Sequence, residues 1–231
     1  SYYLQNVYVH CQLNQQASLA YNLVELIPFG VSLNKERLLT AWNKLIQIQD
    51  AFRATFYTDS TGKYYMRVND VETLTDIPEY SIADDEAARI LVTERLSRPY
   101  DLKNGPLYFI ELYHDADGRY LLAVYTHHLI SDGWSLDELS KQLYALYEKK
   151  EVTVTGSFAN YVFDTYEKEQ SSLGTDSKQY WDHYLQDIPD LKLQGFNTDS
   201  DNTDYATGCV YTRMDAALSE AIQQYCSRHH V

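Results

Sequence analysis

Apolar and polar residues alternate in several short runs of the chain, and this alternation is the pattern of half-buried β-strands. Two pairs of runs are separated by turn residues, Thr61-Gly62 in one pair and Asp117-Gly118 in the other, so each pair predicts a hairpin. The strands predicted up to the middle of the chain are 21–29, 52–57, 64–68, 107–113 and 120–126.

Between the strands, apolar residues recur at the three- and four-residue spacing of helices. Asn34 and Asp84 are good N-cap residues and each precedes such a stripe, while Arg98-Pro99 ends the second helix. Ser135 and Glu138 have the spacing of a capping box and open a third helix. The remaining predicted elements are helices at 158–169, 178–186 and after Asp215, a polar loop at 197–204 and a strand at 208–213.

The order of these elements decides the fold class. Helices interleave with strands, as in α/β proteins, but two strand pairs are hairpins and so cannot belong to a purely parallel sheet. We therefore predict an α/β fold with a mixed β-sheet flanked by helices. With 231 residues, 45% of them hydrophobic, the chain is large enough to bury a substantial core.

Charge and cysteine content narrow the possible partners. The chain has 33 acidic and 19 basic residues, a formal net charge of −14, which argues against binding to nucleic acid or to anionic lipid. Its longest apolar runs are strand-sized, and no charged-then-apolar leader is visible. Three widely spaced cysteines, Cys11, Cys209 and Cys226, suit a reducing compartment. We expect a cytoplasmic protein with no membrane contact.

The most specific cluster of chemically active residues follows the strand predicted at 120–126. His127 and His128 are adjacent, Asp132 comes four positions after the second histidine, and Gly133 follows. Successive side chains of an extended segment point to opposite faces, so only one of the two histidines can face a given cavity. Histidine is the natural proton acceptor near neutral pH, and glycine allows a tight bend or the close approach of a substrate.

The residues alone leave a purely structural role open for this cluster, because adjacent histidines also occur on surfaces and in satisfied cores. A metal site is disfavoured, since the histidines with Asp132 lack the i, i+4 spacing of a zinc pair on a helix. The chain also lacks a Gly-x-Ser-x-Gly nucleophile elbow and a glycine-rich phosphate loop.

Resemblance to a family favours a functional role. Residues 126–135, THHLISDGWS, closely resemble the HHxxxDG loop of condensation domains of nonribosomal peptide synthetases, which belong to the chloramphenicol acetyltransferase-like superfamily. Other segments agree, although Gln49-Asp50 stands where the family usually has His-Glu before LRTxF. The further segments similar to family motifs are 52–56 (LRTxF), 98–107 (RPFDL…GPL), 158–161 (a loose YxDYA) and 180–193 (YWxxxL…PxLxL).

The resemblance implies a chloramphenicol acetyltransferase-like lobe and covers only about the first half of a condensation domain. We therefore expect residues 1–231 to form the N-terminal lobe, with the C-terminal lobe absent. Two histidines rather than aspartate exclude a heterocyclisation domain, and Trp134 directly after Gly133 favours peptide-bond formation over epimerisation.

The implied catalytic residue is His128, which takes a proton from the attacking amine or holds the amine and the tetrahedral intermediate by hydrogen bonding. His127 is implied to be a structural partner. Asp132 and Arg53 resemble the family's buried ion pair, which braces the loop without touching substrate.

Three further residues of the loop have implied roles. Gly133 offers its backbone N–H or its missing side chain to the pantetheine path. Trp134 and Ser135 are candidates for the tunnel wall, and Trp134 is equally a candidate for filling the core.

The resemblance also implies partners. These are a donor and an acceptor peptidyl carrier protein, the C-terminal lobe of the same domain and an adjacent adenylation domain. Phosphopantetheine would arrive on the carriers, so no directly bound cofactor, metal or nucleotide is expected. The chain is expected to fold but to be inactive alone. The alternatives are a stand-alone acyltransferase of the same superfamily and a non-catalytic docking or truncated module.

Overall fold

The computed structural model describes residues 1–188 and 214–230. The chain divides into two compact units, 1–194 and 195–231. The main sheet and the HHxxxDG segment lie in the first unit, and the described part of the second unit contains helix α8 (Ala216–His229). The predicted loop at 197–204 and the predicted strand at 208–213 lie outside the described residues.

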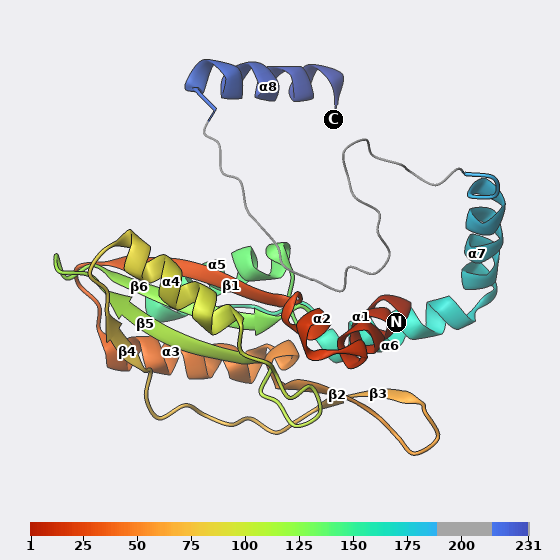
Figure 1. Ribbon diagram of the computed structural model, residues 1–231, viewed down its shortest axis with the longest axis horizontal. Coiled ribbons are helices and arrows are strands. Elements are labelled where there is room, and N and C mark those ends of the chain that lie inside the picture. The colour runs from red at the N-terminus through yellow and green to blue at the C-terminus, as the bar shows by residue number, and fades with distance from the viewer. Residues whose placement is uncertain (189–213, 231) are drawn as a thin grey trace. The chain divides into compact units, whose positions relative to one another are not determined.

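Four strands form the main sheet in the order β1-β6-β5-β4 (Figure 1). Strand β6 (Tyr120–His127) lies between β1 (Asn22–Gly30) and β5 (Tyr108–His114) and is antiparallel to both. Strand β4 (Glu79–Ser81) is parallel to β5. The prediction of a mixed sheet is confirmed, although β4 itself was not predicted because three residues are too few to show an alternation.

A separate two-stranded sheet consists of β2 (Ala54–Thr58) and β3 (Tyr64–Val68). It follows a single 3-10 turn, η1 (Asp50–Arg53), which leads directly out of the C-terminal end of α3. The predicted hairpin is confirmed, but its first strand begins at Ala54 rather than at residue 52, because residues 50–53 form the 3-10 turn. The elements that lead into the hairpin matter for the site, because η1 and the end of α3 line the cavity described below.

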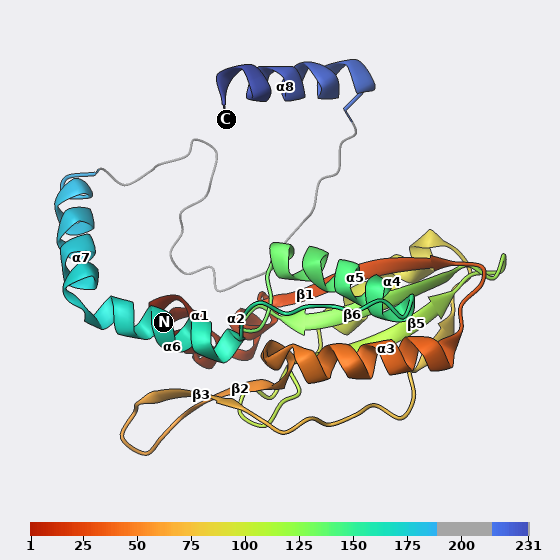
Figure 2. The same cartoon turned by 180° about the vertical axis from the view of Figure 1, so that it is seen from behind.

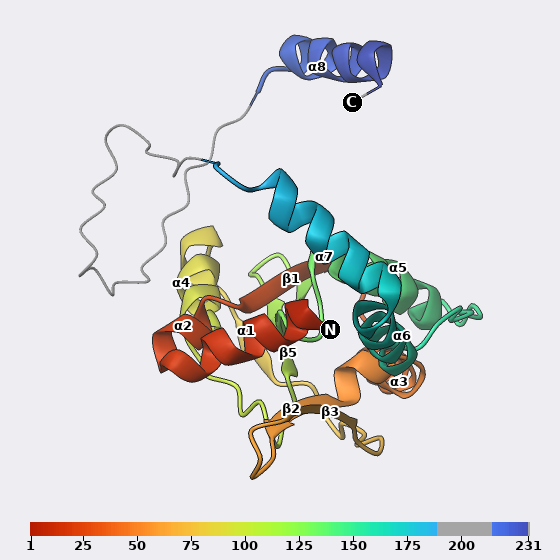
Figure 3. The ribbon, with the colours of Figure 1, turned by 90° about the vertical axis from the view of Figure 1, so that its right-hand side faces the viewer.

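Helices cover both faces of the main sheet (Figures 2 and 3). Helices α3 (Lys35–Ile48) and α5 (Gly133–Tyr147) pack side by side on one face, and α4 (Asp85–Leu96) lies on the other. The predicted caps are confirmed, since Asn34 accepts a hydrogen bond from the Arg37 N–H and Asp84 accepts one from the Ala87 N–H.

The period-two alternation of the strands assigns core residues to the two faces. On β6, Leu122 and Val124 join the larger core with Trp42 of α3, whereas Ala123 and Tyr125 pack against α4. The same parity puts position 127, the last residue of β6, on the side of Ala123 and Tyr125. It predicts the opposite side for His128, the first residue of the turn that follows.

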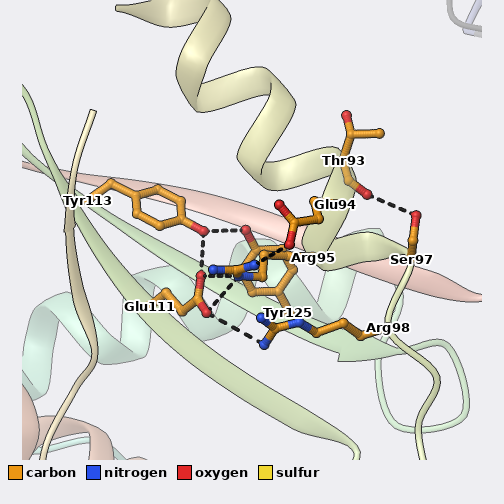
Figure 4. A network of polar contacts seen from close by, with 8 residues as sticks. All are labelled: Thr93, Glu94, Arg95, Ser97, Arg98, Glu111, Tyr113 and Tyr125. Atoms are coloured by element: carbon orange, nitrogen blue, oxygen red, sulfur yellow. Dashed lines mark hydrogen bonds and ion pairs between the residues drawn. The ribbon is translucent and has the colours of Figure 1, made fainter. Parts of the chain in front are cut away.

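A buried polar network ties α4 to the sheet (Figure 4). The Arg95 Nε donates to both carboxylate oxygens of Glu111 at 2.9 Å, and the Tyr113 hydroxyl donates to Glu111 Oε2 at 2.7 Å. The hydroxyl oxygens of Tyr113 and Tyr125 are 2.7 Å apart, and burial raises the pKa of Tyr125 to about 12. Glu111 is 3% and Arg95 8% exposed, so this ion pair is compensated inside the protein rather than by water.

The remaining helices are α1 (Tyr2–Leu13), α2 (Gln15–Leu19), α6 (Phe158–Gln170) and α7 (Ser172–Tyr184). Helix α6 matches its prediction, whereas α7 begins six residues before the predicted start at residue 178. Helix α8 begins after Asp215, as predicted. Within the described residues, no helix combines the length and the apolar character needed to cross a membrane.

Candidate active site

His127 ends strand β6 and is fully buried. Its Nδ1 accepts a hydrogen bond from the Leu129 N–H at 3.2 Å, so the neutral ring carries its proton on Nε2, which lies 3.7 Å from Cys11 Sγ. Burial, and then the neighbouring His128, lower the pKa of His127 to about 4. The ring is therefore neutral at physiological pH and is held on both sides by protein atoms, which suits a structural role.

His128 is the half-buried histidine, and its side chain lines a cavity of about 520 Å³. Its backbone N–H donates to the Tyr21 carbonyl at 2.8 Å, which fixes the residue beside the start of β1. The ring meets the Tyr21 ring edge-on, with centroids 6.3 Å apart. Its Nδ1 lies 3.5 Å from the Tyr3 hydroxyl, the one hydrogen bond that the imidazole makes within the described residues. The other ring nitrogen has no hydrogen-bond partner among the described residues.

The loop between β6 and α5 is held as a tight turn. The Ile130 N–H donates to the His127 carbonyl at 3.0 Å, and the hydroxyls of Thr126 and Ser131 are 2.6 Å apart inside the protein. These two bonds close the loop on either side of His128. The imidazole is therefore attached to a backbone with little freedom to move.

Asp132 is the N-cap of α5. Its Oδ1 accepts hydrogen bonds from the Ser135 backbone N–H at 2.8 Å and from the Ser135 hydroxyl at 2.6 Å. Hydrogen bonds from Ser135 hold the pKa of Asp132 below its ordinary value. The helix therefore begins at Gly133, and the capping box predicted for Ser135 and Glu138 is wrong, because Asp132 already occupies the Ser135 N–H.

The predicted buried ion pair between Arg53 and Asp132 is not formed within the described residues. Asp132 is exposed and its carboxylate is used as a helix cap, while Arg53 Nη1 donates to the Asn69 carbonyl at 3.0 Å. The Asn69 side chain in turn donates to the Arg53 carbonyl at 2.9 Å, which fixes Arg53 against the start of the β2–β3 sheet. Arg53 thus braces the hairpin rather than the histidine loop.

Gly133 and Trp134 both face open space in this lobe. Gly133 is helical, and a Cβ atom built on it would meet none of the described residues within 4 Å, so neither its backbone conformation nor its packing against them requires glycine. Trp134 is 86% exposed, which contradicts the interpretation of this residue as core filling.

Five elements line the cavity beside His128. Tyr3 and Leu4 come from α1, Leu45 and Gln49 from the end of α3, and Ala51 and Phe52 from η1. Helix α5 contributes Ser135, Glu138, Leu139 and Gln142, and α6 contributes Phe158 and Tyr161. The histidine loop closes the wall with residues 128–132. A volume of this size is typical of sites that bind small molecules. Within the described residues, no group of three or more His, Cys, Asp or Glu side chains is placed to hold a metal ion.

Comparison with known proteins decides the family. The family model described as "Condensation domain" matches residues 3–231, nearly the whole chain. The chain belongs to this condensation-domain family. Membership agrees with the resemblance of the 126–135 loop to condensation domains of nonribosomal peptide synthetases.

Curated relatives of this condensation-domain chain are large synthetases. Chondramide synthase cmdD of Chondromyces crocatus is 26% identical over 196 residues, which are 79% of this chain and 5% of the relative. Gramicidin S synthase 2 of Aneurinibacillus migulanus is 30% identical over 179 residues, which are 77% of this chain and 4% of the relative. The chain thus spans only a small fraction of the curated relatives it matches.

Solved condensation domains share the fold. The starter condensation domain of the rhizomide synthetase RzmA superposes with a TM-score of 0.70 at 17% identity and covers 82% of this chain and 48% of its own. The first condensation domain of the calcium-dependent antibiotic synthetase, in complex with substrate analogue 2a, gives a TM-score of 0.69 at 18% identity, with 81% and 47% covered. The predicted chloramphenicol acetyltransferase-like α/β fold is confirmed, and the chain spans about half of each neighbour.

One departure from the family pattern gains an explanation. Asp50, where the resemblance to the family leads one to expect Glu, accepts hydrogen bonds from the Ser157 hydroxyl and from the N–H groups of Phe158 and Ala159 at 2.7 to 2.9 Å. Burial by itself would raise the pKa of Asp50, but the hydrogen bonds to the carboxylate outweigh that effect and lower the pKa. Asp50 therefore fixes the start of α6, and with it Tyr161, against the cavity.

Of the cavity residues outside the histidine loop, sequence reasoning named Ser135 as a candidate for the tunnel wall and missed the others, and Trp134, its companion in that prediction, is not among the lining residues. Tyr3 lies on α1, which was not predicted, although Leu4, Val7, Tyr8 and Cys11 have helical spacing. On α5 the leucines at 136, 139 and 143 recur at helical spacing and are buried. The polar residues Ser135, Glu138 and Gln142 have the same helical spacing, and that stripe was the signal for a second, functional face.

Proposed function

We propose that the chain is the N-terminal lobe of a condensation domain that forms an amide bond, and that His128 is its catalytic residue. The observation that supports this is the separation of the two histidines. His127 is buried and held by the protein, whereas His128 lines the cavity with one ring nitrogen available.

The proposed step joins an amine to a thioester carbonyl. The amine nitrogen attacks the carbonyl carbon, the new C–N bond forms, the C–S bond breaks, and one proton passes from nitrogen to the departing sulfur. A free α-amine has a pKa near 8, so part of it is neutral at pH 7 and needs positioning as much as deprotonation. With the Nδ1–H of His128 directed to the Tyr3 hydroxyl oxygen, the other ring nitrogen accepts a hydrogen bond from the amine and relays its proton.

We propose that both substrates arrive as phosphopantetheine thioesters on a donor and an acceptor carrier protein, in a synthetase that also contains an adenylation domain. The open space at Gly133 supports the passage of a pantetheine arm beside the start of α5, since no described residue comes within 4 Å of a Cβ atom built there. A side chain at this position would narrow that passage without disturbing the lobe.

We further propose that the C-terminal lobe covers the aromatic side chains that α6 and α7 leave exposed. Tyr161 is 64%, Phe163 58%, Tyr180 59% and Trp181 53% exposed, which is an unusual amount of aromatic surface for two neighbouring helices. The solved neighbours are about twice as long as the matched region, which supports a second lobe as the covering surface. Catalysis by positioning would then need both lobes, and the chain alone is expected to be inactive.

The test is a His128→Ala substitution in the complete condensation domain, assayed with two loaded carriers. Amide formation should fall by roughly 10²- to 10⁴-fold, the usual contribution of a positioned acid–base group. His114→Ala is the matched control, because His114 ends β5 at the hairpin, the opposite end of β6 from His128, and should leave the rate near wild type. A folded His128→Ala domain with near-wild-type condensation would refute the proposal.

A further inference from the structure

The cavity beside His128 has an uneven chemical character. One part of its wall is apolar, made by residues such as Leu4, Leu45, Phe52, Leu139 and Phe158. The carboxylates that line it are those of Asp132 and Glu138, both on exposed residues, and no Lys or Arg side chain is among the described lining residues. The cavity therefore combines an apolar wall with two carboxylates.

The two carboxylates differ in what they can offer a ligand. Asp132 is occupied as the cap of α5 and accepts two hydrogen bonds from Ser135. Glu138 makes no ion pair within the described residues and accepts a hydrogen bond there from the Gln142 amide at 2.9 Å. A carboxylate has about four acceptor positions, so Glu138 keeps most of its capacity for a cationic partner.

A ladder of amides orients Glu138. The Gln49 amide at the end of α3 donates to Gln142 Oε1 at 2.7 Å, and the Gln142 amide donates to Glu138 Oε1. This chain of bonds runs from the end of α3 to α5, two helices that lie on the same face of the sheet (Figure 2). The Gln142 amide directs an N–H group toward the carboxylate. No Lys or Arg side chain is among the described lining residues, and Lys141, one turn further along α5, acts on Glu138 through its charge but pairs with Asp137.

We propose that this cavity receives the side chain of one of the two condensing residues, and that Glu138 selects a long cationic side chain of the lysine, ornithine or arginine class. The proposal rests on the proposed function, because only a substrate held at His128 would place its side chain here. The apolar wall packs the methylene stem, and Glu138 pairs with the charged head, as expected for an amphipathic side chain. A cationic side chain of the donor residue and one of the acceptor residue would make the same contact with Glu138. The experiment therefore varies the two residues separately.

The experiment uses the complete condensation domain with carriers loaded with lysine or with norleucine, its neutral counterpart of nearly equal length. One arm varies the acceptor residue against a fixed donor, and the other varies the donor against a fixed acceptor. In one arm the wild-type domain should prefer lysine by about fivefold in kcat/KM, the factor that corresponds to about 1 kcal/mol for an exposed ion pair.

Glu138→Gln should bring the lysine-to-norleucine ratio of that arm to about one, and Glu138→Lys should bring it below one. Asp137→Asn is the matched control, because it removes the same charge from the neighbouring position of α5, where Asp137 pairs with Lys141 and does not line the cavity. It should keep the wild-type ratio. If Glu138→Gln abolishes the preference for lysine when the acceptor residue is varied, the pocket holds the acceptor side chain. If it abolishes the preference when the donor residue is varied, the pocket holds the donor side chain.

Equal ratios in the wild-type and Glu138→Gln domains, in both arms, would overturn the inference. The proposed function is tested separately by norleucine transfer in the wild-type domain and its dependence on His128. A domain that condenses norleucine through His128 but ignores the charge at position 138 would therefore refute the pocket assignment alone.

Discussion

Replacing Glu111 by glutamine should destabilise the lobe strongly, because the carboxylate is the centre of the buried network between α4 and the sheet. Glu111 receives two hydrogen bonds from Arg95 Nε and one from the Tyr113 hydroxyl, and both charged residues are almost fully buried. The substitution removes the charge but leaves the Arg95 guanidinium in place. Arg95 then lacks a buried counter-charge, since its other carboxylate partner, Glu94, lies at the surface.

The magnitude follows from this geometry. Removing one partner of a buried ion pair costs about 3–5 kcal/mol, whereas an exposed pair contributes about 0–1 kcal/mol. Glutamine can still accept one hydrogen bond, so we expect a loss near the lower limit, about 3 kcal/mol in the free energy of unfolding. For a chain of this length, such a loss lowers Tm by roughly 6–12 °C.

The assay is urea unfolding of the isolated chain followed by circular dichroism, with Glu94→Gln as the matched control. Glu94 also contacts Arg95, at 3.0 Å, but its side chain is 68% exposed, so its loss should cost about 1 kcal/mol or less. If the two substitutions lower the unfolding free energy equally, burial of the network is not what makes it stabilising, and the reasoning fails.

Three other predictions follow from the site. Because the pKa of His127 is about 4 when folded and about 6.5 when unfolded, stability should be constant above pH 6.5 and fall by up to about 3 kcal/mol as the pH drops to 4; urea titrations should show a flatter profile for His127→Gln. Gly133→Ala should leave Tm unchanged but slow condensation in the complete domain, whereas an unchanged rate would remove the argument for a pantetheine passage. Asp132→Ala removes a helix cap and should lower the free energy of unfolding by about 1 kcal/mol. A double-mutant cycle with Arg53→Met should give a coupling energy near zero, whereas a coupling above about 1 kcal/mol would show that Arg53 and Asp132 do form an ion pair.

The sheet and most helices were predictable because their signals are local. The alternation along β6 and the turn at Gly118 specify the hairpin, and Asn34 and Asp84 mark the starts of their helices. The same alternation was sufficient to predict that the two histidines face opposite sides, which the buried His127 and the cavity-lining His128 agree with.

Features that depend on contacts between distant segments were not predictable in this way. Whether the Asp132 carboxylate pairs with Arg53 or caps α5 depends on three-dimensional distance, and the local Ser135 N–H is the nearer partner. The link from Gln49 to Gln142 joins residues 93 positions apart, and the seat of α6 on Asp50 joins residues more than 100 apart. Polar residues on a helix that is otherwise assigned to the core gave the one usable hint.

The central claim is that this lobe supplies His128 to a reaction that needs the whole domain. The most direct measurement is a single-turnover time course of peptidyl thioester formation, followed by intact-protein mass spectrometry with donor and acceptor carriers loaded with amino acids. It compares the isolated chain, the complete wild-type domain and the complete His128→Ala domain. We predict that, of these three proteins, only the complete wild-type domain forms product at an appreciable rate above the carriers-only background. Product formed at a comparable rate by the isolated chain, or by the His128→Ala domain, would contradict the account.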